Sequence, residues 1–445
     1  MEILVIGGGY VGITTATCLA REKNNVILME IDKKRVATLQ NDDLPIFEPG
    51  LDSLYKKARE DGKITVTDSY KEAIKNSEIS MVCVGTPQSE RGDYNLDYMR
   101  SAIEGLGTAL RGKKERHTIV VRSTVPPGTS REMLATIEYN FSNQEHYPNM
   151  AMHPEHLVEG SAVHDFLNPA KIIVGQEYST AGDAVLQAYY DAKILKKGDP
   201  RICRLSLEEA ETEKLLSNSW LASDITLTNE SANICDAVGV DFYKVIGAVL
   251  KDPRLGNRKF TRAGPGYGGS CFPKDVAGLT AFAETKGYKA EYFRQVMKTN
   301  KAQPRIVAEE LHQRYLSGFE EKRVGVLGVT FKGDTDDLRE TPIKPLIEEL
   351  KKLGKGKTIF RISDPFAKRE NVKNVFGMSL KDMHDVANWA DLLIVGSDHS
   401  QYQGQDFINM LYAKEHNGGH VFDAKNSFGG KFKAVGRWAT EVVKI

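Results

Sequence analysis

The chain has 445 residues, 41% of them hydrophobic and 27% charged, which is typical of a globular protein with two or three domains. Because 60 basic residues balance 60 acidic residues, the sequence favours neither a nucleic-acid-binding nor a membrane-binding protein. It contains no membrane-length apolar run, no signal-peptide pattern, and five widely spaced cysteines without a CxxC pair. We therefore expect a cytoplasmic protein without a disulfide framework.

Short apolar runs alternate with amphipathic stretches through the first part of the chain. This alternation is typical of a parallel sheet covered by helices on both faces. The expected strands are Ile3–Ile6, Val26–Glu30, Ser80–Val84, Thr118–Arg122, Ala151–His153 and Lys171–Gly175. Helical patterns such as Val11–Arg21 and Lys33–Leu39 lie between several of them. We assign residues 1–205 to a Rossmann-like domain.

A glycine-rich loop follows the first expected strand and opens a helix. Gly7-Gly8-Gly9-Tyr10-Val11-Gly12 matches G-x-G-x-x-G, whose glycines let the backbone approach a pyrophosphate at a helix N-terminus. Glu30 ends the second strand 18 positions after Gly12, where an acid binds the adenosine ribose and disfavours NADP. We predict NAD as the cofactor. The predicted contacts here are Gly7, Gly9, Tyr10, Val11, Gly12, Glu30 and the nearby Lys33.

The middle of the chain has helical patterns and lacks strand signals. The expected helices are Ser206–Val238, Asp241–Leu250, Pro273–Lys286 and Tyr292–Tyr315. Acidic residues near the start of the first one suit the helix dipole. We assign residues 206–318 to a central helical domain that joins two outer domains or forms a subunit interface.

Strand–helix alternation returns after Gly318. The expected strands are Arg323–Gly328, Thr358–Ser363, Leu392–Gly396 and Gly419–Phe422. The loop after the first of these lacks the third glycine of a dinucleotide motif. The predicted fold class is α/β, with two Rossmann-like doubly wound domains (1–205 and 319–445) joined by a central helical region.

The most informative stretch is the cysteine loop, Gly264–Asp275. We predict that Pro273 is the first residue of a helix running to Gly287, which places Cys271 just before its N-terminus. The helix dipole favours a thiolate there. Asp275 falls in the first turn of the same helix. The other four cysteines lie in apolar or helical runs and are interpreted as buried structural residues.

Two further clusters carry acids and bases. Glu155 and Glu159 are four residues apart, which places both on one face if the segment is helical, and Lys214 and Asn218 lie one turn apart on the long helix. By spacing alone, both clusters are also typical of a solvated charged face. We predict no metal site, because no cysteine accompanies the nearby histidines.

The cysteine loop resembles the catalytic signature of the UDP-glucose/GDP-mannose dehydrogenase family. Three more segments are similar to the family's motifs and follow in its order: Pro45–Leu51, Val84–Pro87 and Ser123–Thr129. The resemblance spans essentially the whole chain. It implies a nucleotide-sugar substrate and a homodimer or higher homo-oligomer formed through the middle helices.

The resemblance also implies residue roles. Cys271 is the nucleophile, Asp275 its acid/base partner, and Glu155 assists a water molecule. The implied catalytic set is Cys271, Lys214, Asn218, Asp275, Glu155 and Thr124. The implied cofactor contacts add Thr86, Thr124 and Glu159. The implied substrate contacts are Glu155, Glu159, Lys214, Asn218, Arg254, Arg262, Gly268, Lys332 and Lys425, with Arg254 reaching a neighbouring subunit's site. Lys425 stands where the family often has Arg, and Lys lacks Arg's bidentate grip on phosphate.

The implied reaction is a four-electron oxidation of a sugar C6 alcohol to a carboxylate. Cys271 captures the aldehyde as a thiohemiacetal, a second oxidation gives a thioester, and water releases the acid. The cysteine loop is most similar to the UDP-glucose branch, with GDP-mannose second and N-acetylmannosamine third. A two-electron hydroxyacid dehydrogenase, which also has a Lys-x-x-x-Asn helix, and a non-catalytic NAD-binding regulator remain the alternatives.

Overall fold

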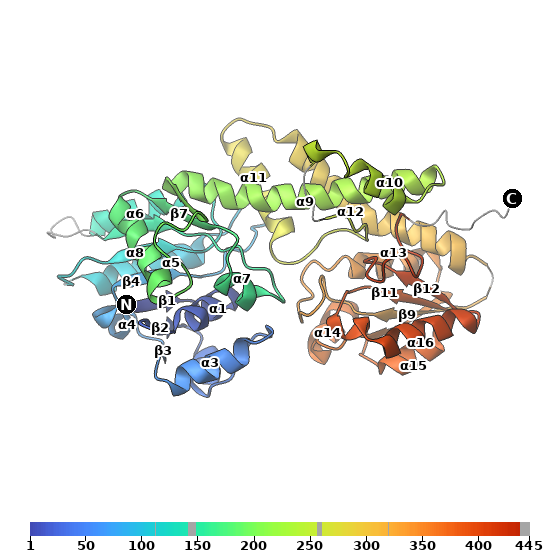
Figure 1. Ribbon diagram of the computed structural model, residues 1–445, viewed down its shortest axis with the longest axis horizontal. Helices are drawn as coiled ribbons and strands as arrows, with labels where there is room; N and C mark the ends of the chain where they lie inside the picture. The colour runs from blue at the N-terminus through green and yellow to red at the C-terminus, as the bar shows by residue number, and fades with distance from the viewer. Residues whose placement is uncertain (112, 141–147, 256–259, 319, 437–445) are drawn as a thin grey trace. The chain divides into compact units, whose positions relative to one another are not determined.

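The computed structural model describes residues 1–111, 113–140, 148–255, 260–318 and 320–436 (Figure 1). Its contacts separate two units, Met1–Ser217 and Asn218–Ile445. Among the described residues, no helix is both long and apolar enough to cross a membrane. The last residues of the predicted third domain, 437–445, lie outside the described part of the chain.

The first unit is built on an eight-stranded sheet with the order β3-β2-β1-β4-β5-β6-β7-β8. The chain moves from β1 to β3 on one side and from β4 to β6 on the other. The topological switch point, where dinucleotides bind in such sheets, therefore lies between β1 and β4. The strands are β1 (Glu2–Ile6), β2 (Asn25–Met29), β3 (Ile64–Thr67), β4 (Ile79–Val82), β5 (Thr118–Val121), β6 (Asn149–Met152), β7 (Ile172–Gln176) and β8 (Ile202–Leu205).

All six strands predicted here are confirmed, and β3 and β8 were missed. Both are edge strands with few buried side chains, so neither has the apolar run that marks an inner strand. One pair also departs from the expected parallel sheet, because β6 and β7 are antiparallel. A parallel return needs a long crossover, and the only helix between these strands has six residues.

Helices flank this sheet. They are α1 (Tyr10–Leu19), α2 (Lys33–Gln40), α3 (Leu51–Glu60), α4 (Tyr70–Asn76), α5 (Asp97–Leu110), α6 (Thr129–Asn140), α7 (Ala162–Leu167) and α8 (Ser179–Asp191). Helix α1 is buried from Gly12 to Leu19, since small residues such as Ala16 let it pack closely. This packing fixes the N-terminus of α1 beside the end of β1.

The predicted helical region is confirmed for the described residues between 207 and 318. Its elements are α9 (Leu207–Ala237), α10 (Phe242–Val249), η1 (Pro253–Leu255), α11 (Phe272–Thr285), α12 (Glu291–Leu311) and the π-helical turn η2 (His312–Leu316). Helix α11 begins at Phe272, one residue before the predicted Pro273. The α9 helix, drawn in green in Figure 1, runs from the first unit into the second.

The second unit ends in a four-stranded parallel sheet with the order β10-β9-β11-β12. Its strands are β9 (Lys322–Leu327), β10 (Thr358–Ser363), β11 (Leu392–Val395) and β12 (His420–Asp423). The neighbouring helices are α13 (Ile343–Leu353), α14 (Arg369–Phe376), α15 (Met383–Trp389), η3 (Ser400–Gln403) and α16 (Gln405–His416). The switch point lies between β9 and β11, so the predicted α/β class with two doubly wound sheets is confirmed. The domain limits at 205 and 318 stay a prediction.

Candidate active site

The glycine loop after β1 has the geometry that a dinucleotide requires. A Cβ atom on Gly12 would lie 1.8 Å from the Gly7 carbonyl oxygen, and one on Gly7 would lie 2.6 Å from the Cys83 carbonyl oxygen. Gly9, in contrast, faces open space and has no side chain to cap α1. The N–H groups at the start of α1 can therefore meet a pyrophosphate, so the loop fits NAD.

Glu30 follows β2 directly, beside this loop, and is buried. Its Oε2 accepts the Gly8 N–H at 2.8 Å, and its Oε1 accepts N–H groups from Ile31 and Asp32 at 2.7 and 2.9 Å. The carboxylate is thus fixed where the ribose of NAD is expected. Arg35, which was not among the predicted contacts, has its guanidinium 3.7 Å from Glu30. Lys33 is an exposed residue at the start of α2.

Glu48, a buried carboxylate within the Pro45–Leu51 segment, holds Tyr10. Glu48 Oε2 accepts the Tyr10 hydroxyl, and the same carboxylate accepts N–H groups from Gly160 at 2.8 Å and Ala162 at 2.7 Å. Burial and Glu48, with a smaller contribution from Glu159, raise the pKa of Tyr10. Glu48 therefore joins the cofactor loop to the segment that carries Glu159. The sequence feature that could have pointed to Glu48 is its position directly before Pro49-Gly50 in a loop.

Two loops on the β4 and β5 side carry the predicted threonines. Thr86 is buried, and its hydroxyl donates to the Thr124 carbonyl oxygen at 2.7 Å. A few residues later, the N–H groups of Gly128 and Ser130 donate to the buried Glu211 carboxylate of α9, each at 2.6 Å. Glu211 therefore fixes the loop after Thr124 to the helix that carries Lys214. Glu211 is one of the acidic residues near the start of this helix that were expected only to suit the helix dipole.

Lys214 and Glu155 form a buried ion pair with an Nζ–Oε1 distance of 3.1 Å. Burial alone would raise the pKa of Glu155, but the Lys214 ammonium and the Leu157 N–H outweigh it and lower that pKa. The structure contradicts a solvated charged face for these two residues. It also contradicts the helical alternative for Glu155 and Glu159, because residues 153–158 form a loop.

A second, partly exposed polar cluster lies next to this pair along the chain. Glu213, next to Lys214 on α9, accepts bonds from Lys171, His156 and Ser217. Burial opposes ionisation of Glu213, but these partners lower its pKa to about 2. The charge on Glu213 is therefore stable, and it holds His156 beside Glu155.

In the second unit, Asn218 and Asp275 meet in a buried cluster. The Asn218 amide donates to Asp275 Oδ2 at 2.5 Å, and Lys274 forms an ion pair with Asp275 Oδ1. Asp275 has no exposed surface. Lys274 lies within the cysteine loop, and no role was predicted for it. Each member is thus held by a charged or amide partner.

Cys271 occupies the N-cap position of α11 without a capping hydrogen bond from its thiol. Its side chain is half-buried, and Ser270 Oγ lies 3.5 Å from its Sγ. Asp275, in the first turn of α11, donates its N–H to the Cys271 carbonyl oxygen at 2.9 Å. The predicted helix-terminal position is therefore present, and it favours a thiolate.

The other cysteines differ from Cys271. Cys18, Cys83 and Cys235 are buried as predicted, and burial raises the pKa of Cys18 and of Cys83 to about 12. Cys203 was also predicted to be buried, and this was wrong. It lies exposed on β8, since an edge strand leaves part of its surface to solvent.

The remaining predicted substrate contacts also lie in the second unit. Lys332 follows β9, and Lys425 follows β12 and donates to the Phe331 carbonyl oxygen at 3.2 Å. Burial lowers the pKa of Lys425, partly offset by Asp398. A Cβ atom on Gly268 would lie 2.0 Å from the Glu340 carbonyl oxygen.

Two predicted arginines are exposed. Arg262 lies at the surface before the cysteine loop. Arg254, in η1, pairs with Asp252 through a 2.5 Å contact and projects into solvent. An exposed Arg254 fits the expectation that it acts outside its own subunit, which stays a prediction.

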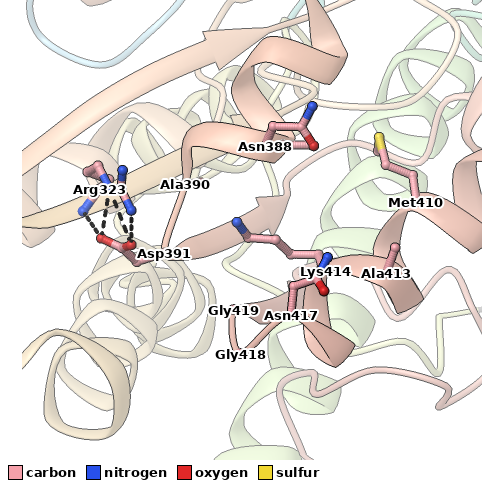
Figure 2. Close-up of a pocket in the computed structure, with 11 residues that line it drawn as sticks. Arg323, Asn388, Ala390, Asp391, Met410, Ala413, Lys414, Asn417, Gly418 and Gly419 are labelled. Carbon is pink, nitrogen blue, oxygen red and sulfur yellow. Dashed lines mark hydrogen bonds and ion pairs between the residues drawn. The ribbon is translucent and has the colours of Figure 1, made fainter.

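A pocket of about 290 Å³ opens beside the amino ends of the strands of the second sheet (Figure 2). Its wall includes Arg323 at the start of β9 and Asp391 just before β11, which form an ion pair at 2.6 Å. Ligands in open α/β sheets bind beyond the carboxyl ends of the strands, and this pocket lies at the amino ends. It therefore does not mark the site.

The fold and the glycine loop define an NAD-binding protein with a second doubly wound domain. Sequence profiles of the UDP-glucose/GDP-mannose dehydrogenase family match the chain in three parts: the NAD binding domain at residues 1–193, the central domain at 208–302 and the UDP binding domain at 325–429. The chain belongs to the UDP-glucose/GDP-mannose dehydrogenase family. It is an NAD-dependent oxidoreductase that acts on a nucleotide sugar.

Individual relatives agree on the family and differ in substrate. A UDP-glucose 6-dehydrogenase of Pseudomonas aeruginosa is 35% identical over 416 residues, covering 92% of this chain and 90% of that protein. A GDP-mannose 6-dehydrogenase of Pseudomonas savastanoi pv. phaseolicola is 34% identical over 417 residues, covering 91% and 92%. The structure of a UDP-glucose dehydrogenase from the hyperthermophilic archaeon Pyrobaculum islandicum matches with a TM-score of 0.86, 30% identity and 98% coverage of both chains.

Proposed function

We propose that this protein oxidises UDP-glucose to UDP-glucuronate through a thioester on Cys271. The observation that carries the proposal is the position of Cys271, half-buried at the N-terminus of α11, in the helix that also bears Asp275. A helix N-terminus stabilises the thiolate, which is the nucleophilic form. A dehydrogenase that stops at an aldehyde or ketone has no use for such a thiol.

The Cys271 sulfur retains the carbon between two oxidations. NAD, held by the glycine loop after β1, would supply the hydride acceptor for each oxidation, so that one sugar would consume two NAD. The thiolate adds to the C6 aldehyde to form a thiohemiacetal, and loss of a hydride from that carbon gives the thioester. Water then displaces the sulfur, which yields the carboxylate and returns the thiol.

Two buried clusters serve the oxygen chemistry in this proposal. The Lys214 ammonium and the Asn218 amide donate to the sugar oxygen and stabilise negative charge on it. Glu155, ionised through its contact with Lys214, directs the hydrolytic water. Asp275 is the proton acceptor near the thiol, with Lys274 supporting its charge. Thr124 orders a water molecule.

The remaining assignments concern binding. Gly7, Gly9, Tyr10, Val11, Gly12, Glu30, Lys33, Thr86, Thr124 and Glu159 contact the cofactor. Glu155, Glu159, Lys214, Asn218, Arg262, Gly268, Lys332 and Lys425 contact the substrate, and Arg254 serves a neighbouring subunit. A reducing cytoplasm suits this chemistry, because it keeps the nucleophilic thiol available.

The test is to count NADH released per molecule of sugar at complete conversion. We expect two NADH with UDP-glucose and a higher kcat/KM than with GDP-mannose or the N-acetyl analogues. If two NADH were released with GDP-mannose and none with UDP-glucose, the protein would be a GDP-mannose 6-dehydrogenase. Release of one NADH per sugar would support a two-electron dehydrogenase. Release of no NADH with any nucleotide sugar would support a non-catalytic NAD-binding regulator.

A further inference from the structure

The loop after β9 is held between the ends of its two neighbouring strands. It runs from Val329 to Asp334 and carries Phe331 and Lys332. Strand β9 lies between β10 and β11, and all three are parallel, so their carboxyl ends meet at one edge. Residues that follow β10 and β11 are therefore placed to contact this loop.

Asp364 contacts the loop from the β10 side. Its Oδ2 accepts the Val329 N–H at 2.7 Å, and its Oδ1 accepts N–H groups from Phe366 and Ala367 at 2.9 and 2.8 Å. Burial opposes its ionisation, but His399 and these backbone donors lower the pKa of Asp364. A fixed carboxylate therefore holds the start of the loop.

His399 contacts the loop from the β11 side. Its side chain has no exposed surface and lies near the rings of Phe366 and Tyr402. Its Nδ1 accepts the Asp334 N–H at 3.0 Å, so the ring proton must be on Nε2. That proton faces Asp364 Oδ2 at 3.3 Å. One buried pair thus connects both ends of the loop.

Asp334, at the end of the loop, is held by residues after β11. Its backbone has a φ of 55°, a left-handed conformation that Asp adopts more readily than most residues. Its carboxylate accepts the Ser400 N–H at 2.8 Å, and Asp398 accepts the Gly333 N–H at 3.0 Å. Thr330 Oγ1 donates to the Lys332 carbonyl oxygen at 2.8 Å. The two residues that follow Lys332 are therefore each bonded to residues after β11.

The same loop reaches the cysteine loop. A Cβ atom on Gly269 would lie 2.7 Å from the Phe331 ring, so the ring packs directly on this glycine. The Gly269 N–H donates to the Arg339 carbonyl oxygen at 3.1 Å. Gly269 is two residues from Cys271. A shift of Phe331 would therefore change the surroundings of the thiol.

We propose that the buried Asp364–His399 pair positions the Val329–Asp334 loop, and through Phe331 the cysteine loop, for substrate binding and thiol chemistry. The proposal rests on the proposed function for the role of Lys332 and Cys271. His399 touches no reacting atom in it. Both residues act through the backbone that they hold.

Three variants of the full-length protein separate positioning from general support. His399→Leu removes the Nε2–H and Nδ1 contacts. His399→Asn returns an oxygen near the Nδ1 position and so keeps an acceptor for the Asp334 N–H. Phe331→Ala removes only the ring from Gly269. His384→Asn is the matched control, because His384 is exposed on α15.

Two readouts apply to each variant. The first is the change in the KM for the nucleotide sugar, compared with the change in the KM for NAD. The second is the iodoacetamide alkylation rate of Cys271 relative to that of the exposed Cys203, followed by peptide mass spectrometry. In His399→Leu we expect the sugar KM and the relative alkylation of Cys271 to rise on the order of tenfold, with the NAD KM unchanged. His399→Asn should recover part of both losses, because it restores the acceptor for the Asp334 N–H but not the contact to Asp364, and Phe331→Ala should reproduce the alkylation change.

The proposal is overturned if His399→Leu matches the His384→Asn control in both readouts, or if His399→Asn is no better than His399→Leu. If His399→Leu does not fold, the decision rests on Phe331→Ala, whose alkylation ratio must rise. A wild-type protein that oxidises no nucleotide sugar would refute the proposed function. The alkylation ratios would still decide on the positioning pair, because they need no substrate.

Discussion

At the scale of single residues, Lys214 and Glu155 depend on each other because both are buried. Replacing Lys214 with Met leaves the Glu155 carboxylate without its cation, which costs about 3–5 kcal/mol in the free energy of unfolding. In the proposed reaction it also removes a donor to the substrate oxygen, so kcat should fall roughly 10²–10³-fold. Denaturant unfolding and NADH production measure the two effects.

The double variant Lys214→Met/Glu155→Gln is the control for this pair. With no buried charge left unpaired, most of the lost stability should return, while kcat stays low. If kcat recovered together with stability, the role of Lys214 would be structural and its proposed catalytic role would be wrong.

Glu211 makes the stability of the first unit depend on pH. Burial, opposed by hydrogen bonds from Ser130 and Gly128, raises the pKa of Glu211 to about 7. A carboxyl whose pKa is raised on folding stabilises the fold below its unfolded pKa, and that stability is lost as pH rises through 7. Relative to Glu211→Gln, the wild type should lose about 3 kcal/mol in the free energy of unfolding between pH 5 and pH 8.

Glu230 supplies the comparison for that measurement, because it is exposed on the same helix. The difference between wild type and Glu230→Gln should stay flat across the same pH range. A flat difference for Glu211→Gln as well would mean that Glu211 keeps its charge throughout.

At the scale of elements, two glycines at the start of α1 have different physical roles. A methyl group on Gly12 would collide with the Gly7 carbonyl oxygen, so Gly12→Ala should push α1 from β1 and cost about 3 kcal/mol or more. Gly9 faces open space, so Gly9→Ala should leave the melting temperature unchanged. It should weaken NAD binding on the order of tenfold, because a pyrophosphate needs that space.

Thermal unfolding gives the stability of the two variants, and titration with NAD gives their affinity for the cofactor. Unaltered NAD binding in Gly9→Ala would place the pyrophosphate away from the loop. Wild-type stability in Gly12→Ala would show that the contact between α1 and β1 can relax.

The helices and strands that could be predicted are those whose own residues carry a clear apolar or helical pattern. Inner strands such as β1 and β4 are mostly apolar, with one polar residue each, and α9 continues for 31 residues without a glycine or proline. Edge strands β3 and β8 were missed because their burial depends on a single neighbouring strand. The antiparallel β6–β7 pair was missed because direction follows from the connection, which an apolar run does not encode.

In the candidate site, too, the locally encoded features were predictable and the long-range contacts were not. The glycine loop and the position of Cys271 before a helix were predictable, since each is specified within about a dozen residues. The polar partners were not. Glu48 accepts the Gly160 N–H across 112 positions, and Glu211 accepts the Gly128 N–H across 83. Only the folded chain brings such groups together.

At the scale of the whole molecule, α9 and the residue that follows it, Val238, leave a row of large apolar side chains in solvent. The exposed fractions are 71% for Trp220, 51% for Leu227, 57% for Ile234 and 66% for Val238. Their spacing places them along one side of the helix. We propose that a second copy of the chain covers this row, as expected from the family resemblance, because exposed apolar patches of this kind mark interfaces.

The oligomer prediction is that light scattering coupled to size-exclusion chromatography gives a mass of at least twice 49.5 kDa. The double variant Trp220→Glu/Leu227→Glu should run as a monomer, because burying two carboxylates in an apolar interface is costly. Tyr178→Glu, at an exposed tyrosine in the first unit, should keep the wild-type mass. A monomeric wild-type protein would exclude the interface.

The central claim is that the sugar carbon becomes bonded to Cys271 during oxidation. The most direct measurement is acid quenching during turnover with NAD and UDP-glucose, followed by mass spectrometry of the protein and its peptides. We predict a nucleotide-sugar acyl adduct on the Cys271 peptide, absent in Cys271→Ala, which should still bind NAD but form no acid. Full acid production by Cys271→Ala, with no adduct on the wild-type protein, would contradict the account.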